Sequence, residues 1–202
     1  MNSISSTIYS LLEWITRFAF IQLLWILFTL AGGIILGFFP STIAMFAIVR
    51  SWIRGNSDIP IFTSFVNFYK SEFIKSNKLG IVIMVVVAFV GLDLYYIQQN
   101  ANTYLSWTSI PLFAFMALFV LFLFYLFPAF VHYDLNNISI FKNAFLIMLI
   151  NPINTFFIVF SLASLFAIMC LFPALAFIFG ASSYAFITMW FSLYAFNKAH
   201  KA

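Results

Sequence analysis

LGIVIMVVVAFVGLDLYY, residues Leu79–Tyr96, contains no lysine or arginine and a single acid, Asp93. About twenty apolar residues in a helix, rising about 1.5 Å each, match the roughly 30 Å hydrocarbon core of a bilayer. Three further long apolar stretches lie outside this one, and a soluble domain of this size has no room to bury them all. The sequence therefore predicts an integral membrane protein.

The composition of the 202 residues supports a single membrane domain over 1–202, because 65% are hydrophobic and only 7% are charged. The lone cysteine, Cys170, allows neither an intramolecular disulfide nor a thiolate zinc site. The net charge of +4 is explained by membrane topology, since the basic residues stand beside apolar spans and form no nucleic-acid patch. We expect the lipid bilayer as a partner and no nucleic acid.

The block from Phe18 to Val49 is too long for one straight crossing. Glycine favours turns and proline suits the first turn of a helix, so we expect a helix to about Leu30, a turn, and a shorter helix over Pro40–Ile53. The alternative is one long kinked crossing, and the second helix of the hairpin could span only part of the membrane. The expected turn residues are Gly32, Gly33, Gly37 and Pro40.

The segment from Arg50 to Lys78 carries five of the nine basic residues, which places it in the cytoplasm by the positive-inside bias. Aromatic residues recur in it at helical spacing after Pro60, as in an amphipathic helix lying on the inner leaflet. Because this segment offers charges and rings together, it is the expected contact site for a protein partner. The candidate partner-binding residues are Arg50, Arg54, Phe65, Phe68, Lys70, Phe73 and Lys75.

The rest of the chain continues this topology: Leu79–Tyr96 crosses outward and Ile110–Val131 returns. The apolar residues around Lys142 predict a second interfacial helix. Ile153–Leu171 and Pro173–Phe196 then form a last hairpin. The prediction is an all-α, polytopic bundle of five to six membrane helices in hairpins, with two cytoplasmic interfacial helices. Both termini are expected in the cytoplasm and the bundle in the cell membrane.

Groups that could carry chemistry are few. Asp93, Gln98 and Trp107 near the outer loop could contact a ligand, although such residues also anchor spans at the interface. We find no metal-protease, nucleophile-elbow or phosphate-loop motif and no credible pair of catalytic carboxylates. We therefore expect no enzyme, no catalytic or metal-binding residue and no cofactor.

A glycine-rich turn precedes Pro40-Ser41-Thr42, the next helix ends in Val49-Arg50, and Phe65, Phe68 and Phe73 precede the long span. These three features between Gly32 and Gly80 resemble the YesL-like family of small bacterial membrane proteins. The biochemical function of this family is uncertain. The resemblance implies an association with carbohydrate-uptake ABC transporters, whose genes its members typically accompany.

Two hypotheses for function follow. The first is a non-enzymatic accessory or regulatory protein that contacts the permease subunits of a carbohydrate ABC transporter through the cytoplasmic elements. The second is an independent carrier or channel for a small solute or a lipid, with its path around the broken first hairpin at Gly32–Pro40. A proton-coupled carrier usually has ionisable groups near the middle of the membrane, and the predicted spans have almost none.

Overall fold

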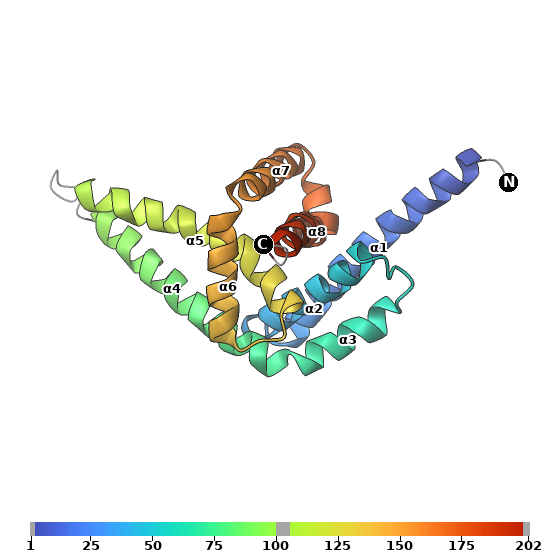
Figure 1. Cartoon of the computed structure of the whole chain (residues 1–202), viewed down its shortest axis with the longest axis horizontal. Coiled ribbons are helices and arrows are strands. Elements are labelled where there is room, and N and C mark those ends of the chain that lie inside the picture. The colour runs from blue at the N-terminus through green and yellow to red at the C-terminus, as the bar shows by residue number, and fades with distance from the viewer. Residues whose placement is uncertain (1–2, 100–105, 200–202) are drawn as a thin grey trace.

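The computed structural model describes residues 3–99 and 106–199, with side chains over 7–97 and 110–198, and within this part it contains eight α-helices and no strand (Figure 1). The helices are α1 (Ser3–Ala31), α2 (Ile35–Ile53), α3 (Ile61–Ser71), α4 (Phe73–Gln99), α5 (Ser106–His132), α6 (Asn137–Ile150), α7 (Pro152–Leu171) and α8 (Pro173–Ala199).

Six helices of the described chain, all except α3 and α6, are long and apolar enough to cross a membrane. The predicted all-α polytopic bundle is therefore confirmed, with six apolar helices from the expected range of five to six. Among the six, α2 is by far the most buried, because the other helices pack around it (Figure 1).

A hairpin joins α1 and α2 through Gly32, Gly33 and Ile34, so the turn lies at two of the four predicted residues, and Gly37 and Pro40 lie inside α2 instead. Gly33 and Ile34 both have a positive φ, +72° and +64°. Glycine adopts such a conformation without strain. Next to the turn, a Cβ atom on Gly37 would lie 2.4 Å from the Thr29 carbonyl oxygen. The absence of a side chain at Gly37 therefore lets the two helices touch backbone to backbone.

The prediction that α2 begins at Pro40 is wrong, because the helix already begins at Ile35 and Pro40 lies inside it. A proline within a helix cannot donate to the carbonyl four residues earlier, here that of Leu36. The Nδ2 of Asn77 on α4 donates to this Leu36 oxygen at 3.0 Å. A side chain from another helix thus replaces the missing backbone donor.

The predicted helix after Pro60 is confirmed as α3, but its aromatic face packs on the protein. Phe65 is 0% exposed, and the Phe28 ring of α1 lies 5.2 Å from the Phe65 ring and 5.1 Å from the Tyr69 ring. Phe73, expected in the same helix, is the first residue of α4. The protein core therefore covers the face that the sequence pattern assigned to the lipid surface.

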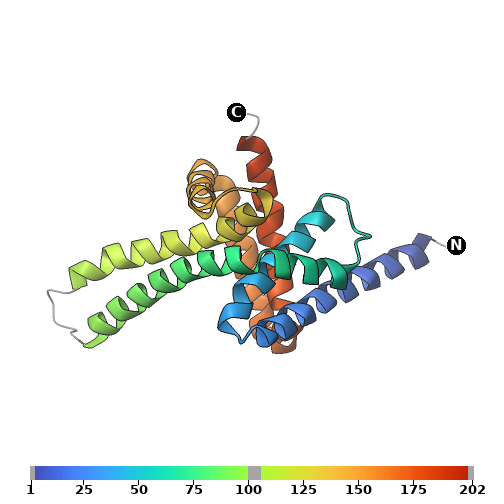
Figure 2. The same cartoon turned by 90° about the horizontal axis from the view of Figure 1, so that it is seen from below.

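The later helices form two more hairpins. The α4 and α5 helices lie side by side and extend away from the N-terminal part of α1 in both views (Figures 1 and 2). The short α6 packs on α5, where the Phe122 and Phe141 rings lie 5.8 Å apart. The α7 and α8 helices meet at Phe172-Pro173, as the sequence predicts.

A buried glutamine links the first and last apolar helices. The Nε2 of Gln22 on α1 donates to the Phe177 carbonyl oxygen of α8 at 3.2 Å. The Oε1 of the same side chain accepts from the Ser182 backbone N–H at 3.0 Å. Gln22 therefore satisfies backbone groups of α8 that no apolar residue at this position could bind.

Candidate functional site

Charged residues from the end of α2, the α3–α4 junction and the end of α5 gather around one pocket, a region that we call the charged end. The Nη2 of Arg54, after α2, lies 3.2 Å from the Nδ1 of His132 at the end of α5. The His132 ring lies 4.8 Å from the Phe196 ring near the end of α8. Residues of the charged end are Arg50, Arg54, Lys70, Glu72, Lys75, Lys78, His132 and Asp134.

The N-terminal half of α1 lies beside the loop that follows α2. The Nη1 of Arg17 donates to the Ser57 carbonyl oxygen at 2.7 Å, and its Nη2 lies 2.6 Å from the Glu13 carboxylate. The Ser57 contact holds α1 to the loop after Arg54, whereas the Glu13 contact lies within α1. The N-terminal half of α1 and the C-terminal end of α8 therefore both lie close to the charged end.

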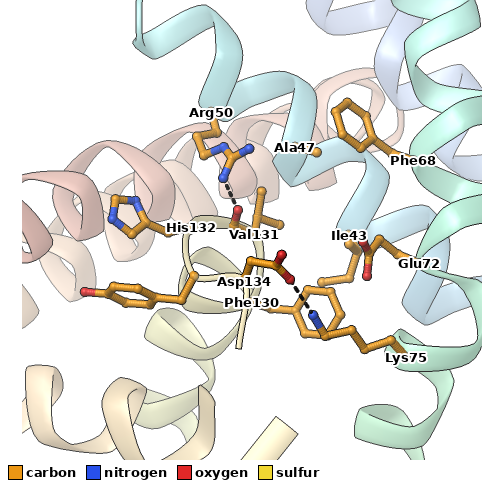
Figure 3. Close-up of a pocket in the computed structure, with 11 residues that line it drawn as sticks. Ile43, Ala47, Arg50, Phe68, Glu72, Lys75, Phe130, Val131, His132 and Asp134 are labelled. Atoms are coloured by element: carbon orange, nitrogen blue, oxygen red, sulfur yellow. Dashed lines mark hydrogen bonds and ion pairs between the residues drawn. The ribbon is translucent and has the colours of Figure 1, made fainter. Parts of the chain in front are cut away.

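A pocket of about 230 Å³ opens at the charged end between α2, the α3–α4 junction and the end of α5 (Figure 3). Its apolar wall contains Ile43 and Ala47 of α2 together with the rings of Phe68 and Phe130. The polar groups approach from three separate parts of the chain. The lining residues are Ile43, Ala47, Arg50, Phe68, Glu72, Lys75, Phe130, Val131, His132, Tyr133 and Asp134.

One ion pair lies at the rim of this pocket. The Nζ of Lys75 lies 3.5 Å from the Asp134 Oδ1 and 5.2 Å from the centre of the Phe130 ring. The Asp134 side chain is exposed to solvent, so the pair contributes little to stability. Its main effect is to hold the Lys75 ammonium group at the edge of the pocket.

Within the described residues, Arg50 and Glu72 are the two charged groups of the pocket without an ionic partner. The Nη1 of Arg50 donates to the Val131 carbonyl oxygen. Ion pairs within the described residues involve Arg17 and Lys75, and none includes Arg50 or Glu72. The two half-buried side chains line the same pocket from different walls and are not paired with each other (Figure 3).

The structure divides the seven predicted partner-binding residues into three groups. Arg54 and Lys70 are exposed, whereas Arg50, Phe68 and Lys75 line the pocket. Phe65 is inside the protein, and the half-buried Phe73 ring packs 5.6 Å from the Tyr69 ring. Phe65 therefore stabilises the fold and offers no surface to a partner.

Two tyrosines near the charged end are shielded from water. Burial raises the pKa of the Tyr69 and Tyr133 phenols above their ordinary value. The Tyr69 hydroxyl donates to the Phe28 carbonyl oxygen at 3.4 Å. Both phenols are therefore neutral at physiological pH, and they contribute no negative charge to this region.

The described residues include only part of the predicted outer ligand site. Asp93 is exposed on α4, and the side chains of Gln98 and Trp107 lie outside the described residues. The ligand role of these three residues stays a prediction. A search of the described residues gives no cluster of three or more histidine, cysteine or acidic side chains that could hold a metal ion.

Sequence reasoning did not assign Glu72, His132 and Asp134 to the site at Arg50. The only signal for Glu72 is that it is the single acid between Lys70 and Lys78. His132 and Asp134 stand 82 and 84 residues after Arg50, and no local pattern connects them. Packing of α5 on α2 brings them together.

Six apolar helices in the described chain, one of them buried among the others, together with a partly polar pocket, define a multi-pass, all-helical membrane protein. The chain belongs to the family described as "Protein of unknown function, DUF624", whose model matches residues 18–94. This match covers the C-terminal half of α1, all of α2 and α3, and most of α4. It therefore includes Arg50, Glu72 and Lys75 but not the α5 side of the pocket.

Three proteins of Bacillus subtilis (strain 168) are similar to this chain. Uncharacterized protein YesV is 31% identical over 98% of this chain and 95% of its own length. Uncharacterized protein YesL is 32% identical over 75% and 71%, and Uncharacterized protein YteU is 41% identical over 60% and 54%. No solved structure matches the chain.

Proposed function

We propose that this protein is a non-enzymatic accessory or regulatory subunit that acts by contact with the permease of a carbohydrate ABC transporter. The observation that carries the proposal is the concentration of charged groups at the α3–α4 junction and at the ends of α2 and α5, in a chain whose long helices are otherwise apolar. The family resemblance supplies the class of partner. A protein whose charged groups are concentrated in one region is suited to binding another protein there.

The contact surface is centred on the α3–α4 junction and the start of α6. Lys70 and Lys78 are exposed there. Large apolar side chains accompany them, since Ile74 is 70% exposed and Ile138 is 84% exposed. Apolar anchors surrounded by charge are typical of protein interfaces. Arg54, also exposed, extends this surface toward the end of α2.

The charged end faces the cytoplasm in this proposal. The basic residues of the α2–α4 connection support that orientation by the positive-inside bias. The contacts of Arg17 with Ser57 and of His132 with Phe196 support the same side for the N-terminal half of α1 and the end of α8. The bundle would lie in the cell membrane with both termini in the cytoplasm.

The transport alternative loses its expected path. A Cβ atom on Gly32 would lie 2.4 Å from the Gly37 Cα, so the backbones of α1 and α2 are in direct contact there. This close packing at Gly32 and Gly37 favours the accessory role over a solute path through the first hairpin. We retain the accessory role as the proposed function.

Co-purification from the native membrane in mild detergent tests this function. The wild-type protein is expected to retain a carbohydrate permease, and Lys70→Glu with Lys78→Glu is expected to release it without loss of expression. Lys142→Glu, an exposed substitution on α6, is the matched control and should retain the permease. Permease recovery that is equal for all three proteins, together with unchanged sugar uptake in a deletion strain, would reject the proposal.

A further inference from the structure

The pocket at the charged end contains one positive and one negative group that lack ionic partners. The Arg50 guanidinium has the Val131 carbonyl as its protein acceptor. The Glu72 carboxylate accepts no side-chain hydrogen bond from the described residues and forms no ion pair with them. A half-buried charge is stabilised when an opposite charge or a hydrogen-bond partner meets it.

The charges of the pocket discriminate between kinds of ligand. A simple anion would approach Arg50 but would meet the carboxylates of Glu72 and Asp134. A simple cation would approach Glu72 but would meet Arg50 and Lys75. A ligand with an anionic group at one end and an ammonium group at the other satisfies both unpaired residues, because each of its charges meets the opposite sign.

The chemistry of the two residues defines the groups. A guanidinium binds phosphate through two parallel N–H···O bonds, and a carboxylate accepts N–H bonds from a primary ammonium. The Phe68 and Phe130 rings provide an apolar wall for the carbon atoms between them. We infer that the pocket binds a phosphate–ammonium zwitterion of the phosphoethanolamine type, with the phosphate on Arg50 and the ammonium on Glu72.

Such a group has two sources, the headgroup of phosphatidylethanolamine and a soluble phosphoethanolamine ester. The pocket lies at the ends of membrane-spanning helices, which brings it close to the depth of lipid headgroups. This inference does not depend on a permease, because the purified protein alone should bind the ligand. Its failure would leave the proposed partner contact untouched.

Binding to the purified, full-length protein is the test. Calorimetric titration in detergent would use glycerophosphoethanolamine, with glycerol 3-phosphate and ethanolamine as the comparison ligands. Native mass spectrometry of protein from nanodiscs would compare phosphatidylethanolamine with phosphatidylglycerol. Binding of the soluble ester supports a soluble source, and retention of phosphatidylethanolamine alone supports the lipid.

Substitutions assign the two charges. Arg50→Gln and Glu72→Gln are each expected to weaken binding about tenfold or more, as for the loss of a charge-assisted hydrogen bond. Lys70→Gln, exposed and outside the pocket, should bind like the wild type. Arg50 also holds Val131, so if Arg50→Gln does not fold, Glu72→Gln decides the question.

Three results would overturn the inference. The first is that neither the soluble ester nor phosphatidylethanolamine binds the wild-type protein. The second is equal binding of phosphatidylglycerol or glycerol 3-phosphate, which would show that the ammonium group has no role. The third is unchanged affinity of a folded Glu72→Gln variant.

Discussion

Asn77 has a structural role that follows from a proline on another helix. Pro40 cannot donate to the Leu36 carbonyl, and the Asn77 amide donates there at 3.0 Å. Asn77→Ala is therefore expected to lower the free energy of unfolding by about 0.5–1.5 kcal/mol, the usual net contribution of one hydrogen bond. Denaturation by SDS in mixed micelles would measure the change.

A double-mutant cycle separates this bond from other roles of Asn77. Pro40→Ala restores a backbone N–H for the Leu36 oxygen, so Asn77→Ala should cost less in that background. Asn67→Ala, on the exposed side of α3, is the matched control and should be near neutral. An equal cost of Asn77→Ala with proline and with alanine at position 40 would contradict the assigned role.

Gly80 allows α4 to approach α2 closely. A Cβ atom at Gly80 would lie 2.2 Å from a ring carbon of Phe39, which is itself buried. Gly80→Ala is therefore expected to lower the free energy of unfolding by about 1–3 kcal/mol through overpacking. The same micelle titration would measure it.

Gly91 on the same helix is the control, because a Cβ atom there meets no atom within 4 Å. Gly91→Ala should leave stability unchanged or raise it by up to about 1 kcal/mol through helix propensity. Equal effects of the two substitutions would show that the approach of Phe39 does not limit position 80.

Single residues also show where sequence reasoning succeeds and fails. The glycines at 32 and 33 predict a turn because Gly33 adopts a positive φ and Gly32 lies against the backbone of Gly37, where a side chain would not fit. Pro40 is misleading, since its preference for a first turn is overridden by a donor 37 positions away in the chain, Asn77. A turn that depends on local backbone geometry can be predicted from the sequence. The position of a proline cannot be predicted in this way when a distant side chain binds the carbonyl that the proline leaves without a donor.

At the scale of elements, α3 is attached to the bundle by its aromatic face. Phe65 is fully buried against Phe28, whereas Phe62 is 55% exposed on the same helix. Phe65→Ala is expected to lower the free energy of unfolding by about 3–5 kcal/mol, the usual cost of deleting a core phenylalanine ring. Phe62→Ala should cost well under 1 kcal/mol, as most surface substitutions do.

Limited proteolysis of the same pair tests the attachment directly. If α3 detaches when Phe65 is lost, cleavage near Lys70 should become faster in Phe65→Ala and remain slow in Phe62→Ala. Equal protection of both variants would mean that the lipid surface, and not the Phe28–Phe65 contact, holds α3 in place.

The sequence predicts the elements better than it predicts their surroundings. Six apolar helices can be read from length and composition, because the bilayer sets a minimum length. The helical spacing of the aromatic residues in α3 predicts an amphipathic helix. It does not predict whether lipid or protein covers the aromatic face. Protein and lipid are equally apolar partners for Phe65, so only the tertiary structure distinguishes them.

At the scale of the whole molecule, half of the candidate site is visible in the sequence. The basic residues around Arg50 and Lys75 form a local cluster, and the positive-inside bias makes them conspicuous. Glu72 and Asp134 gain their significance from the pocket that α2, α4 and α5 enclose together. Residues that meet only through packing cannot be grouped from spacing alone.

Site-specific photo-crosslinking in the native membrane tests the proposed partner contact most directly. A photoreactive amino acid would replace Lys70 or Lys78 at the charged end, and Val87, 53% exposed on α4, in a control. Adducts containing a carbohydrate permease are expected from positions 70 and 78 and not from 87. The account would be contradicted if adducts formed only from position 87. It would also be contradicted if positions 70 and 78 gave no adduct containing a carbohydrate permease.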